Sequence, residues 1–418
     1  SLTTATFNPP VFSYGSHDAS IFIKEYNDGI IINAITGGAD DVLTINKSLA
    51  KVAKSTNCAI AVGSQYAGIE NELVRSSYEI VREANPEGIV IANLGAYAKV
   101  DDAKLELAKK LVENSFAKKV FFANSGTEAN EGALKLAVKW GKEININKTE
   151  IISTLNGFHG RTTGALALTG QPGKQEPFSS ILPAVKYINY NSIENLKAAV
   201  NENTCAIFLE AIQGEGGIIE LDIEFVKELH ALRDKYNFLI IMDEIQAGLG
   251  RTANELFAYE AYGVNPDLVT LAKGIGGGLP LGAILISEKL ENVFKPGDHG
   301  TTFGGNPVAC AAGNYILSKI IDKDFMNEVK ENAKYLRDSL EALKVKYPEF
   351  ISDIRGRGYM LGLEMGIYAE LSKERAFAQG MLLNVTSGSV LRLIPRINTP
   401  KVELDEFLTK FEDILKSL

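Results

Sequence analysis

Between residues 117 and 300 the chain alternates short apolar runs with amphipathic stretches, and this alternation is what most limits its possible folds. Short runs rich in Ile, Leu, Val and Phe suit strands that are buried on both faces, and the stretches between them have helical spacing. The pattern predicts an α/β fold with a mostly parallel sheet and helices on both of its faces. The expected strands cover residues 120–123, 151–154, 206–210 and 238–243, and a helix is expected over residues 128–142.

Polar residues stand where three of these expected strands end. They are Asn124, Glu210 and Asp243. Sheets of this kind bind ligands outside the carboxyl ends of their strands. We therefore expect the functional site at this edge of the sheet.

A chain of 418 residues is long enough for two or three domains. We expect an atypical α/β segment over residues 1–104, a large domain over 105–310 that holds the functional site, and a small domain over 311–418. Beyond residue 324, long Lys/Glu-rich helices and the apolar segments 362–364 and 390–393 predict that the small domain is also α/β.

Charge and cysteine content favour small-molecule chemistry. The net charge is −9 with both signs interspersed, which argues against a nucleic-acid or membrane-surface partner. The 3 cysteines and 4 histidines are scattered, which predicts neither a disulfide framework nor a metal site. The longest apolar runs are shorter than the roughly 18 residues of a membrane span, and no basic-then-apolar signal pattern opens the sequence. A reducing cytoplasm fits these features.

Lys273 and Asp243 form the most informative pair. Lys273 stands among apolar residues and glycines in Leu-Ala-Lys-Gly-Ile-Gly. Loss of solvation disfavours its ammonium form, so the free amine can attack a carbonyl. Pyridoxal phosphate supplies such a carbonyl, and a buried carboxylate such as Asp243 would keep its ring nitrogen protonated. The alternative is a surface lysine in a glycine loop.

Two further segments suit this cofactor. Ser125, Gly126 and Thr127 lead from an expected strand into a helix, where backbone N–H groups and hydroxyls can hold a phosphate. The alternative for this segment is an ordinary helix N-cap. Phe158 lies on a glycine-flanked loop and could stack on a planar cofactor, although a lone Phe is more often a core residue.

Two arginines are candidates for carboxylate binding. Arg161 follows the Phe158 loop, and Arg392 stands inside an apolar strand. A buried arginine needs a partner, and Glu215 is one candidate for Arg392. The alternative for both arginines is an ordinary surface salt bridge.

Six motifs in one order resemble the class III, fold type I, pyridoxal-phosphate aminotransferases, most closely the acetylornithine aminotransferases. They are Ser125-Gly-Thr-Glu-Ala-Asn130, Gly157-Phe-His-Gly-Arg-Thr162, Glu210-Ala-Ile-Gln-Gly-Glu-Gly-Gly217, Asp243-Glu-Ile-Gln246, Leu271-Ala-Lys-Gly274 and Gly297-Asp-His-Gly-Thr-Thr-Phe-Gly-Gly-Asn-Pro307. The resemblance covers about residues 105–418. Small departures are Ala211, where proline is usual in the family, and Ala253, where glycine is usual.

The resemblance implies a role for each candidate residue. Lys273 would be the imine-forming lysine and the proton shuttle, and Asp243 would pair with the pyridinium nitrogen. Gln246 would approach the phenolic oxygen of the cofactor, and Phe158 would stack on its ring. The cofactor-binding set would be Ser125, Gly126, Thr127, Phe158, Asp243, Gln246, Lys273 and Thr302. Thr302 would reach across from a second subunit, so the resemblance implies a homodimer.

The resemblance also implies the reaction and its substrates. The terminal amine of N2-acetylornithine, or of a related ω-amino donor, would pass to 2-oxoglutarate and give glutamate and a semialdehyde, as in arginine biosynthesis. Arg161 would hold the α-carboxylate of the amino acid and Arg392 the distal carboxylate of glutamate or 2-oxoglutarate. Glu215 would pair with Arg392 when the other substrate is bound. Ornithine, succinylornithine and 4-aminobutyrate remain alternative donors.

Residues from about 30 to 104 resemble a different family. Residues 30–38, 59–65 and 89–95 are expected strands, with helices over 43–55 and 72–84, and they are similar to part of the type 2 isopentenyl-diphosphate isomerases. In that family Thr36, Ser64 and Asn93 would lie near a flavin. Three βα units cannot close an eight-stranded barrel, so flavin isomerase activity is not expected.

Three explanations of this segment stay open: a generic βαβ stretch, a mosaic chain, or an aminotransferase whose entry segment has been replaced. If the segment leaves the substrate pocket incomplete, the chain would be a catalytically impaired protein that binds pyridoxal phosphate.

Overall fold

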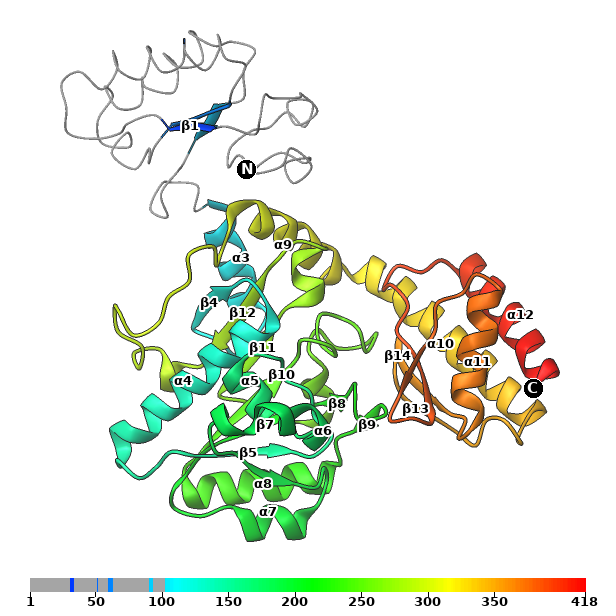
Figure 1. The fold of residues 1–418 in the computed structure, drawn as a ribbon, viewed down its shortest axis with the longest axis horizontal. Coiled ribbons are helices and arrows are strands. Elements are labelled where there is room, and N and C mark those ends of the chain that lie inside the picture. The colour runs from blue at the N-terminus through cyan, green and yellow to red at the C-terminus, as the bar shows by residue number, and fades with distance from the viewer. Residues whose placement is uncertain (1–30, 34–50, 52–58, 63–89, 93–101) are drawn as a thin grey trace. The chain divides into compact units, whose positions relative to one another are not determined.

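The computed structural model describes residues 31–33, 51, 59–62, 90–92 and 102–418 (Figure 1). The chain divides into two compact units, Ser1–Asp102 and Ala103–Leu418. The division of the second unit at residue 310 stays a prediction.

The first unit contains a small parallel sheet. Strands β1 (Ile31–Asn33), β2 (Ala59–Val62) and β3 (Val90–Ala92) pair in that order. Each lies inside an expected strand, so the three strand predictions are confirmed. Of the expected helices only Lys51 is described, and it is helical. Thr36, Ser64 and Asn93 lie outside the described residues.

Seven strands form the central sheet of the second unit, in the order β4-β12-β11-β10-β7-β5-β6. The strands are β4 (Lys119–Ala123), β5 (Glu150–Thr154), β6 (Lys186–Ile188), β7 (Thr204–Glu210), β10 (Leu239–Asp243), β11 (Leu268–Leu271) and β12 (Gly282–Ile286). β12 is antiparallel to β4 and β11, and the other neighbours are parallel. The predicted strands and the mostly parallel sheet are confirmed.

Helices cover both faces of this sheet, as predicted (Figure 1). The helices that contribute residues to the cores on these faces are α3 (Asp102–Glu113), α4 (Gly126–Ile144), α5 (Thr163–Leu168), α7 (Ile193–Ala199), α8 (Ile223–Tyr236) and α9 (Pro307–Ile320), and the short α6 (Pro172–Gln175) buries no residue. Short 3-10 helices cover Glu176–Ile181, Ala258–Tyr262, Lys273–Gly276 and Glu288–Leu290, and a hairpin is formed by β8 (Ile212–Gln213) and β9 (Ile219–Glu220).

The two faces follow from the alternation of side chains along the strands. Phe208 and Ile241 pack with Leu136 of α4 in one buried cluster. Ile207 and Ile240, one residue away, belong to the other cluster, which contains α8 residues. All these side chains are almost fully buried, so α4 and α8 are fixed on opposite faces.

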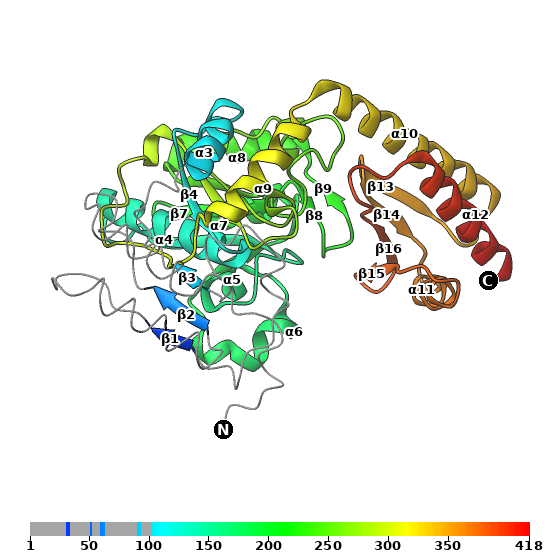
Figure 2. The same ribbon diagram turned by 90° about the horizontal axis from the view of Figure 1, so that it is seen from above.

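A second, four-stranded sheet forms near the C-terminus. Strands β13 (Asp353–Arg357), β14 (Met360–Glu364), β16 (Val390–Leu393) and β15 (Asn384–Thr386) pair in that order, all antiparallel. Figure 2 shows α10 (Lys323–Lys346), α11 (Tyr368–Ala378) and α12 (Lys401–Ser417) grouped around this sheet. The expected strands over 362–364 and 390–393 are confirmed within β14 and β16. Among the described residues, no helix is long and apolar enough to cross a membrane.

Candidate active site

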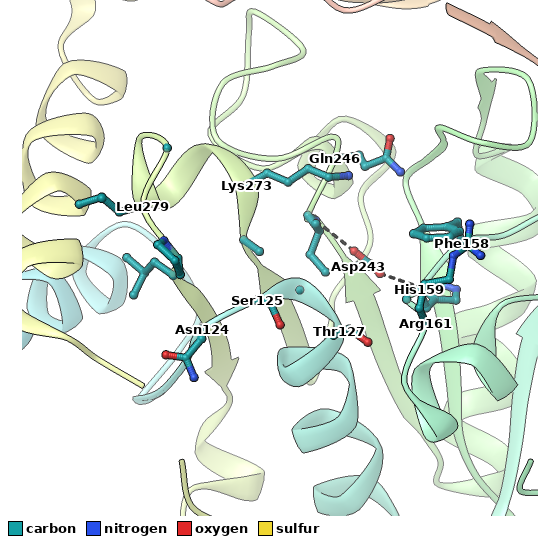
Figure 3. Close-up of a pocket in the computed structure, with 17 residues that line it drawn as sticks. Asn124, Ser125, Thr127, Phe158, His159, Arg161, Asp243, Gln246, Lys273 and Leu279 are labelled. Carbon is teal, nitrogen blue, oxygen red and sulfur yellow. Dashed lines mark hydrogen bonds and ion pairs between the residues drawn. The ribbon is translucent and has the colours of Figure 1, made fainter. Parts of the chain in front are cut away.

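A cavity of about 550 Å³ lies at the edge of the central sheet where Asn124 and Asp243 stand (Figure 3). Its wall comes from four separate parts of the chain: the start of α4, the Phe158 loop, the end of β10, and the segment that follows β11. The lining residues that the sequence predicted are Asn124, Ser125, Gly126, Thr127, Phe158, Arg161, Asp243, Gln246 and Lys273. The fold therefore gathers these nine residues around one cavity.

Asp243 ends β10, and its carboxylate is held from three directions. Oδ2 accepts a hydrogen bond from Asn130 Nδ2 at 2.8 Å and lies 2.8 Å from His159 Nδ1. Oδ1 accepts from the Ile245 backbone N–H at 3.0 Å. The Asp243 residue is only 4 % exposed, so its orientation is fixed at the cavity wall.

His159 and Asn130 are site residues whose roles the sequence reasoning missed. Asn130 Oδ1 accepts from the Thr270 hydroxyl at 2.8 Å, which fixes its amide toward Asp243. Burial alone would lower the pKa of the His159 imidazole, but the hydrogen bond and charge of Asp243, with Glu210, raise that pKa above its usual value. His159 Nε2 is buried and has no hydrogen-bond partner among the described residues. Both residues stand within the quoted motifs, which was the available signal.

Lys273 begins the 3-10 helix that follows β11 after Ala272, with a left-handed backbone φ of 49° that is uncommon for a residue with a side chain. Figure 3 shows its side chain extending toward Gln246. Water reaches Lys273 through the cavity. The surrounding protein nevertheless desolvates the ammonium and lowers its pKa, and Asp243 and Glu210 only partly offset this. A lowered pKa increases the fraction of free amine, which is the nucleophilic form.

Glu210 holds the loop that carries Phe158. Its Oε2 atom accepts from the Phe158 backbone N–H at 3.0 Å, and its Oε1 atom from the Gly214 N–H at 3.4 Å. Burial raises the pKa of Glu210 to about 7, with His159 opposing the rise and Asp243 adding to it. The carboxyl therefore fastens two segments at the rim of the site.

The start of α4 combines a helix cap with a possible anion site. The Ser125 hydroxyl accepts from the Glu128 N–H at 3.3 Å, which is the N-cap that the alternative interpretation described. Thr127 Oγ1 lies 2.8 Å from Thr162 Oγ1. A Cβ added to Gly126 would lie 2.6 Å from Ile245 Cδ1, so a larger residue here requires the Ile245 side chain to shift. The first N–H groups of a helix have no partner within the helix and attract anions.

Arg392 and Glu215 form an ion pair, with Nη1 and Oε1 2.9 Å apart. The same Nη1 donates to the Gly214 carbonyl at 3.0 Å and to Gln246 Oε1 at 3.4 Å. The Arg392 side chain is 10 % exposed and that of Glu215 is 31 % exposed. The pair therefore adjoins Gln246 at the cavity wall while Glu215 keeps access to water.

Arg161 and Thr302 are both exposed, but only Arg161 lines the cavity. The Arg161 guanidinium carbon lies 5.7 Å from the centre of the Phe158 ring, and Lys174 Nζ lies 5.1 Å from it. Within the described part of the chain, Arg161 makes no ion pair with an acidic side chain. Thr302 is not brought to this cavity by its own chain.

The described residues fit pyridoxal phosphate. The start of α4 offers backbone N–H groups for a phosphate, Asp243 presents a fixed carboxylate, and Lys273 presents an amine of lowered pKa. Among the described residues no cluster of acidic, His or Cys side chains could hold a metal ion.

The comparison with protein families decides the identity. The model of the family "Aminotransferase class-III" matches residues 75–415. The chain belongs to the class III aminotransferases. The predicted family, the transaminase fold and pyridoxal phosphate as the cofactor are thereby confirmed. The match begins about thirty residues before the resemblance deduced from motifs, within the segment likened to the isomerases.

Several relatives of this aminotransferase are named for acylated ornithines. The acetylornithine aminotransferase of Caldanaerobacter subterraneus subsp. tengcongensis is 46% identical over 322 residues, which is 76% of this chain and 81% of the relative. The succinylornithine transaminase of Photorhabdus laumondii is 42% identical over 74% of this chain and 78% of its own.

Solved structures agree with this assignment. The ornithine aminotransferase of Toxoplasma gondii is 31% identical, with a TM-score of 0.71 over 76% of this chain and 77% of that one. The N-acetylornithine aminotransferase of Stenotrophomonas maltophilia is 34% identical, with a TM-score of 0.64 over 75% and 79%. The fold of this aminotransferase is thus that of known transaminases.

Proposed function

We propose that this aminotransferase moves the terminal amino group of N2-acetylornithine, or of a related ω-amino donor, to 2-oxoglutarate, as in arginine biosynthesis. The products are a semialdehyde and glutamate. The observation that carries the proposal is the Arg392–Glu215 ion pair, which adjoins Gln246 in the cavity that Lys273 lines. An enzyme that alternates between a dicarboxylate and an ω-amine needs a cation that can be neutralised for one of the two substrates.

Pyridoxal phosphate, when bound, supplies an aldehyde that condenses with amines and a protonated ring that withdraws electrons. Ser125, Gly126 and Thr127 would hold its phosphate at the start of α4. Asp243 would pair with the ring nitrogen, since Asn130 and His159 already fix its carboxylate. Phe158 would cover one face of the ring, and Gln246 would contact its phenolic oxygen.

Lys273 is proposed to carry the acid–base steps. Burial lowers its pKa and so increases the fraction of free amine, and its side chain extends across the cavity toward Gln246. A positioned amine of this kind can take a proton from the substrate carbon that bears the amino group and return it at a neighbouring atom. Asp243 would keep the ring nitrogen protonated, and the positive charge of that nitrogen would stabilise the negative charge that develops when the proton leaves.

Two arginines would hold the substrate carboxylates. Arg161 would bind the α-carboxylate of the amino acid, and its freedom from ion pairs with described acidic side chains supports this role. Arg392 would bind the distal carboxylate of 2-oxoglutarate after the Glu215 side chain leaves it. With acetylornithine, Glu215 would return and neutralise Arg392.

We also propose a homodimer. Val308 and Tyr315 stand seven residues apart on α9 and are 61% and 64% exposed, so one face of this helix presents apolar surface to water. A second copy would cover that face and bring Thr302 to the phosphate site of its partner. The cysteine usage supports a cytoplasmic location.

An absorbance titration of the purified protein tests the function. We expect a band near roughly 410–430 nm that bleaches with N2-acetylornithine and returns with 2-oxoglutarate. Loss and recovery of the band would support a working transaminase. A band that resists both substrates would instead favour the catalytically impaired alternative, in which the N-terminal segment fails to complete the pocket.

A further inference from the structure

The turn that carries Glu215 belongs in sequence to the large α/β part of the chain, yet its contacts go largely to the C-terminal sheet. This turn, residues 214–218, joins β8 to β9. β9 is tied to the same sheet, because Glu220 Oε2 accepts from the Gly356 N–H at 3.2 Å. The turn is named the Glu215 turn below.

Backbone carbonyls of the Glu215 turn accept hydrogen bonds from side chains of the C-terminal sheet region. The Thr386 hydroxyl donates to the Glu215 carbonyl, and the Ser387 hydroxyl does so at 3.4 Å. Arg355 Nε donates to the Gly217 carbonyl at 2.8 Å. Arg392 adds its bond to the Gly214 carbonyl at 3.0 Å. The backbone conformation of the turn is thus held by residues that lie more than 130 positions further along the chain.

Ile218 provides an apolar anchor for the same turn. It is fully buried and has a φ of 57°, a left-handed conformation that is a genuine outlier for a β-branched residue. A Cβ added to Gly356 or Gly362 would lie 2.6 Å or 2.9 Å from Ile218 side-chain atoms. Both glycines belong to the C-terminal sheet, and their lack of side chains leaves the space that the Ile218 side chain fills.

We propose that Thr386, Arg355 and Ile218 are positioning residues that fix the backbone of the Glu215 turn on the C-terminal sheet, so that only the Glu215 side chain moves between substrates. This inference rests on the proposed function for the gating role of Glu215. Arg392 is part of β16 in that sheet. Glu215 and Arg392 are therefore both held by the C-terminal sheet, which keeps the two ends of the ion pair aligned.

The anchoring predicts opposite effects on the two substrates. When the Thr386 hydroxyl is removed, the Glu215 backbone loses a partly buried hydrogen bond and the ion pair to Arg392 weakens. Arg392 then becomes more available to 2-oxoglutarate and less well neutralised for acetylornithine. A general loss of stability would instead impair both substrates together.

The test compares wild type with Thr386→Val and Arg355→Gln in two measurements. Hydrogen exchange of the purified holoenzyme, followed on peptides that cover residues 212–220, should speed up by roughly three- to tenfold in both variants, while β7 stays protected. In half-reactions, Thr386→Val should lower the KM for 2-oxoglutarate and raise that for N2-acetylornithine, each by roughly threefold.

Thr409→Val is the matched control. The Thr409 hydroxyl also donates to a backbone carbonyl, that of Asp405 at 2.8 Å, but on the exposed surface of α12. Neither exchange over 212–220 nor the two KM values should change in this variant. Unchanged exchange in Thr386→Val and Arg355→Gln would overturn the anchoring.

Faster exchange with both KM values unmoved, or moved in the same direction, would overturn the gating role. A wild type that transaminates neither substrate would refute the proposed function, and the gating role with it. The exchange data would still decide the anchoring in that case.

Discussion

Oδ2 of Asp243 lies 2.8 Å from Nδ1 of His159, and both side chains are almost completely buried. The two residues are 84 positions apart, and β10 and the Phe158 loop bring them together. A carboxylate held by an imidazole and an amide keeps one orientation, and reorganisation costs little when charge develops near it. The pair explains how the chain can hold a carboxylate in one orientation at the wall of the cavity that Lys273 also lines.

Lys273→Ala should remove transamination while leaving the fold intact. Loss of a positioned acid–base group reduces turnover by about 10²- to 10⁴-fold, and the absorbance band should vanish because no protein amine remains to form it. Steady-state rates and a spectrum check this. Lys235→Ala is the control, since that lysine is exposed and lies over the Tyr236 ring at 4.7 Å on α8. Turnover at the wild-type level would remove Lys273 from the reaction.

Gly126→Ala should weaken cofactor binding by about tenfold, because overpacking typically costs 1–3 kcal/mol. The added methyl would lie 2.6 Å from Ile245 Cδ1 at the start of α4, and its relief would push the helix start away from the phosphate. Equilibrium dialysis with pyridoxal phosphate measures the Kd. Gly173→Ala is the control, since nothing lies within 4 Å of a Cβ at that position. Equal affinity in the two variants would argue against a phosphate site at Gly126.

Arg392→Lys should raise the KM for 2-oxoglutarate by about tenfold and that for N2-acetylornithine much less. A lysine keeps the charge but loses the planar fork that matches a carboxylate. Initial rates at varied concentrations of each substrate give both constants. Arg396→Lys serves as the control, because Arg396 is exposed and pairs with Glu403 on the surface of the C-terminal part. Parallel rises for both substrates would show that Arg392 has no preference for the dicarboxylate.

Glu244→Gln should flatten the pH dependence of stability. Burial raises the pKa of Glu244 to about 8, although the Ala258 and Tyr259 N–H groups oppose the rise. A carboxyl whose folded-state pKa is raised binds its proton more tightly when folded. The stability this gives is complete below the unfolded pKa of 4.5 and is lost as pH rises through about 8.

Urea unfolding at several pH values between about 5.5 and 8.5 measures this effect. The free energy of unfolding of the wild type should fall more with rising pH than that of Glu244→Gln. Glu143→Gln, an exposed glutamate on α4, should keep the wild-type slope. Identical slopes in wild type and Glu244→Gln would mean that the buried carboxyl titrates alike in both states.

Tyr315→Lys should weaken the proposed dimer, because it places a charge on the exposed apolar face of α9. Sedimentation velocity across a concentration series should show a larger monomer fraction than in wild type. Tyr236→Lys, on α8 and away from that face, serves for comparison. A wild type that is monomeric at all concentrations would refute the homodimer.

Local features were predictable because they depend on neighbours in the chain. The alternation of apolar residues determined the strands up to one or two residues, as at β10, where residue 243 ends both the expected and the observed strand. The residues around Ser125 indicate a helix N-cap, and Ser125 caps α4 in the structure. The motifs around Asp243 and Lys273 were sufficient to predict the family and the cofactor.

The tertiary structure alone decided the contacts between distant segments. The His159 and Asn130 bonds to Asp243 depend on which strands become neighbours, and the antiparallel direction of β12 has no signature in a run of apolar residues. The anchoring of the Glu215 turn on the C-terminal sheet likewise joins residues 171 positions apart. Spacing and composition encode which residues are buried, whereas the partner of each buried polar group is set by how the chain packs.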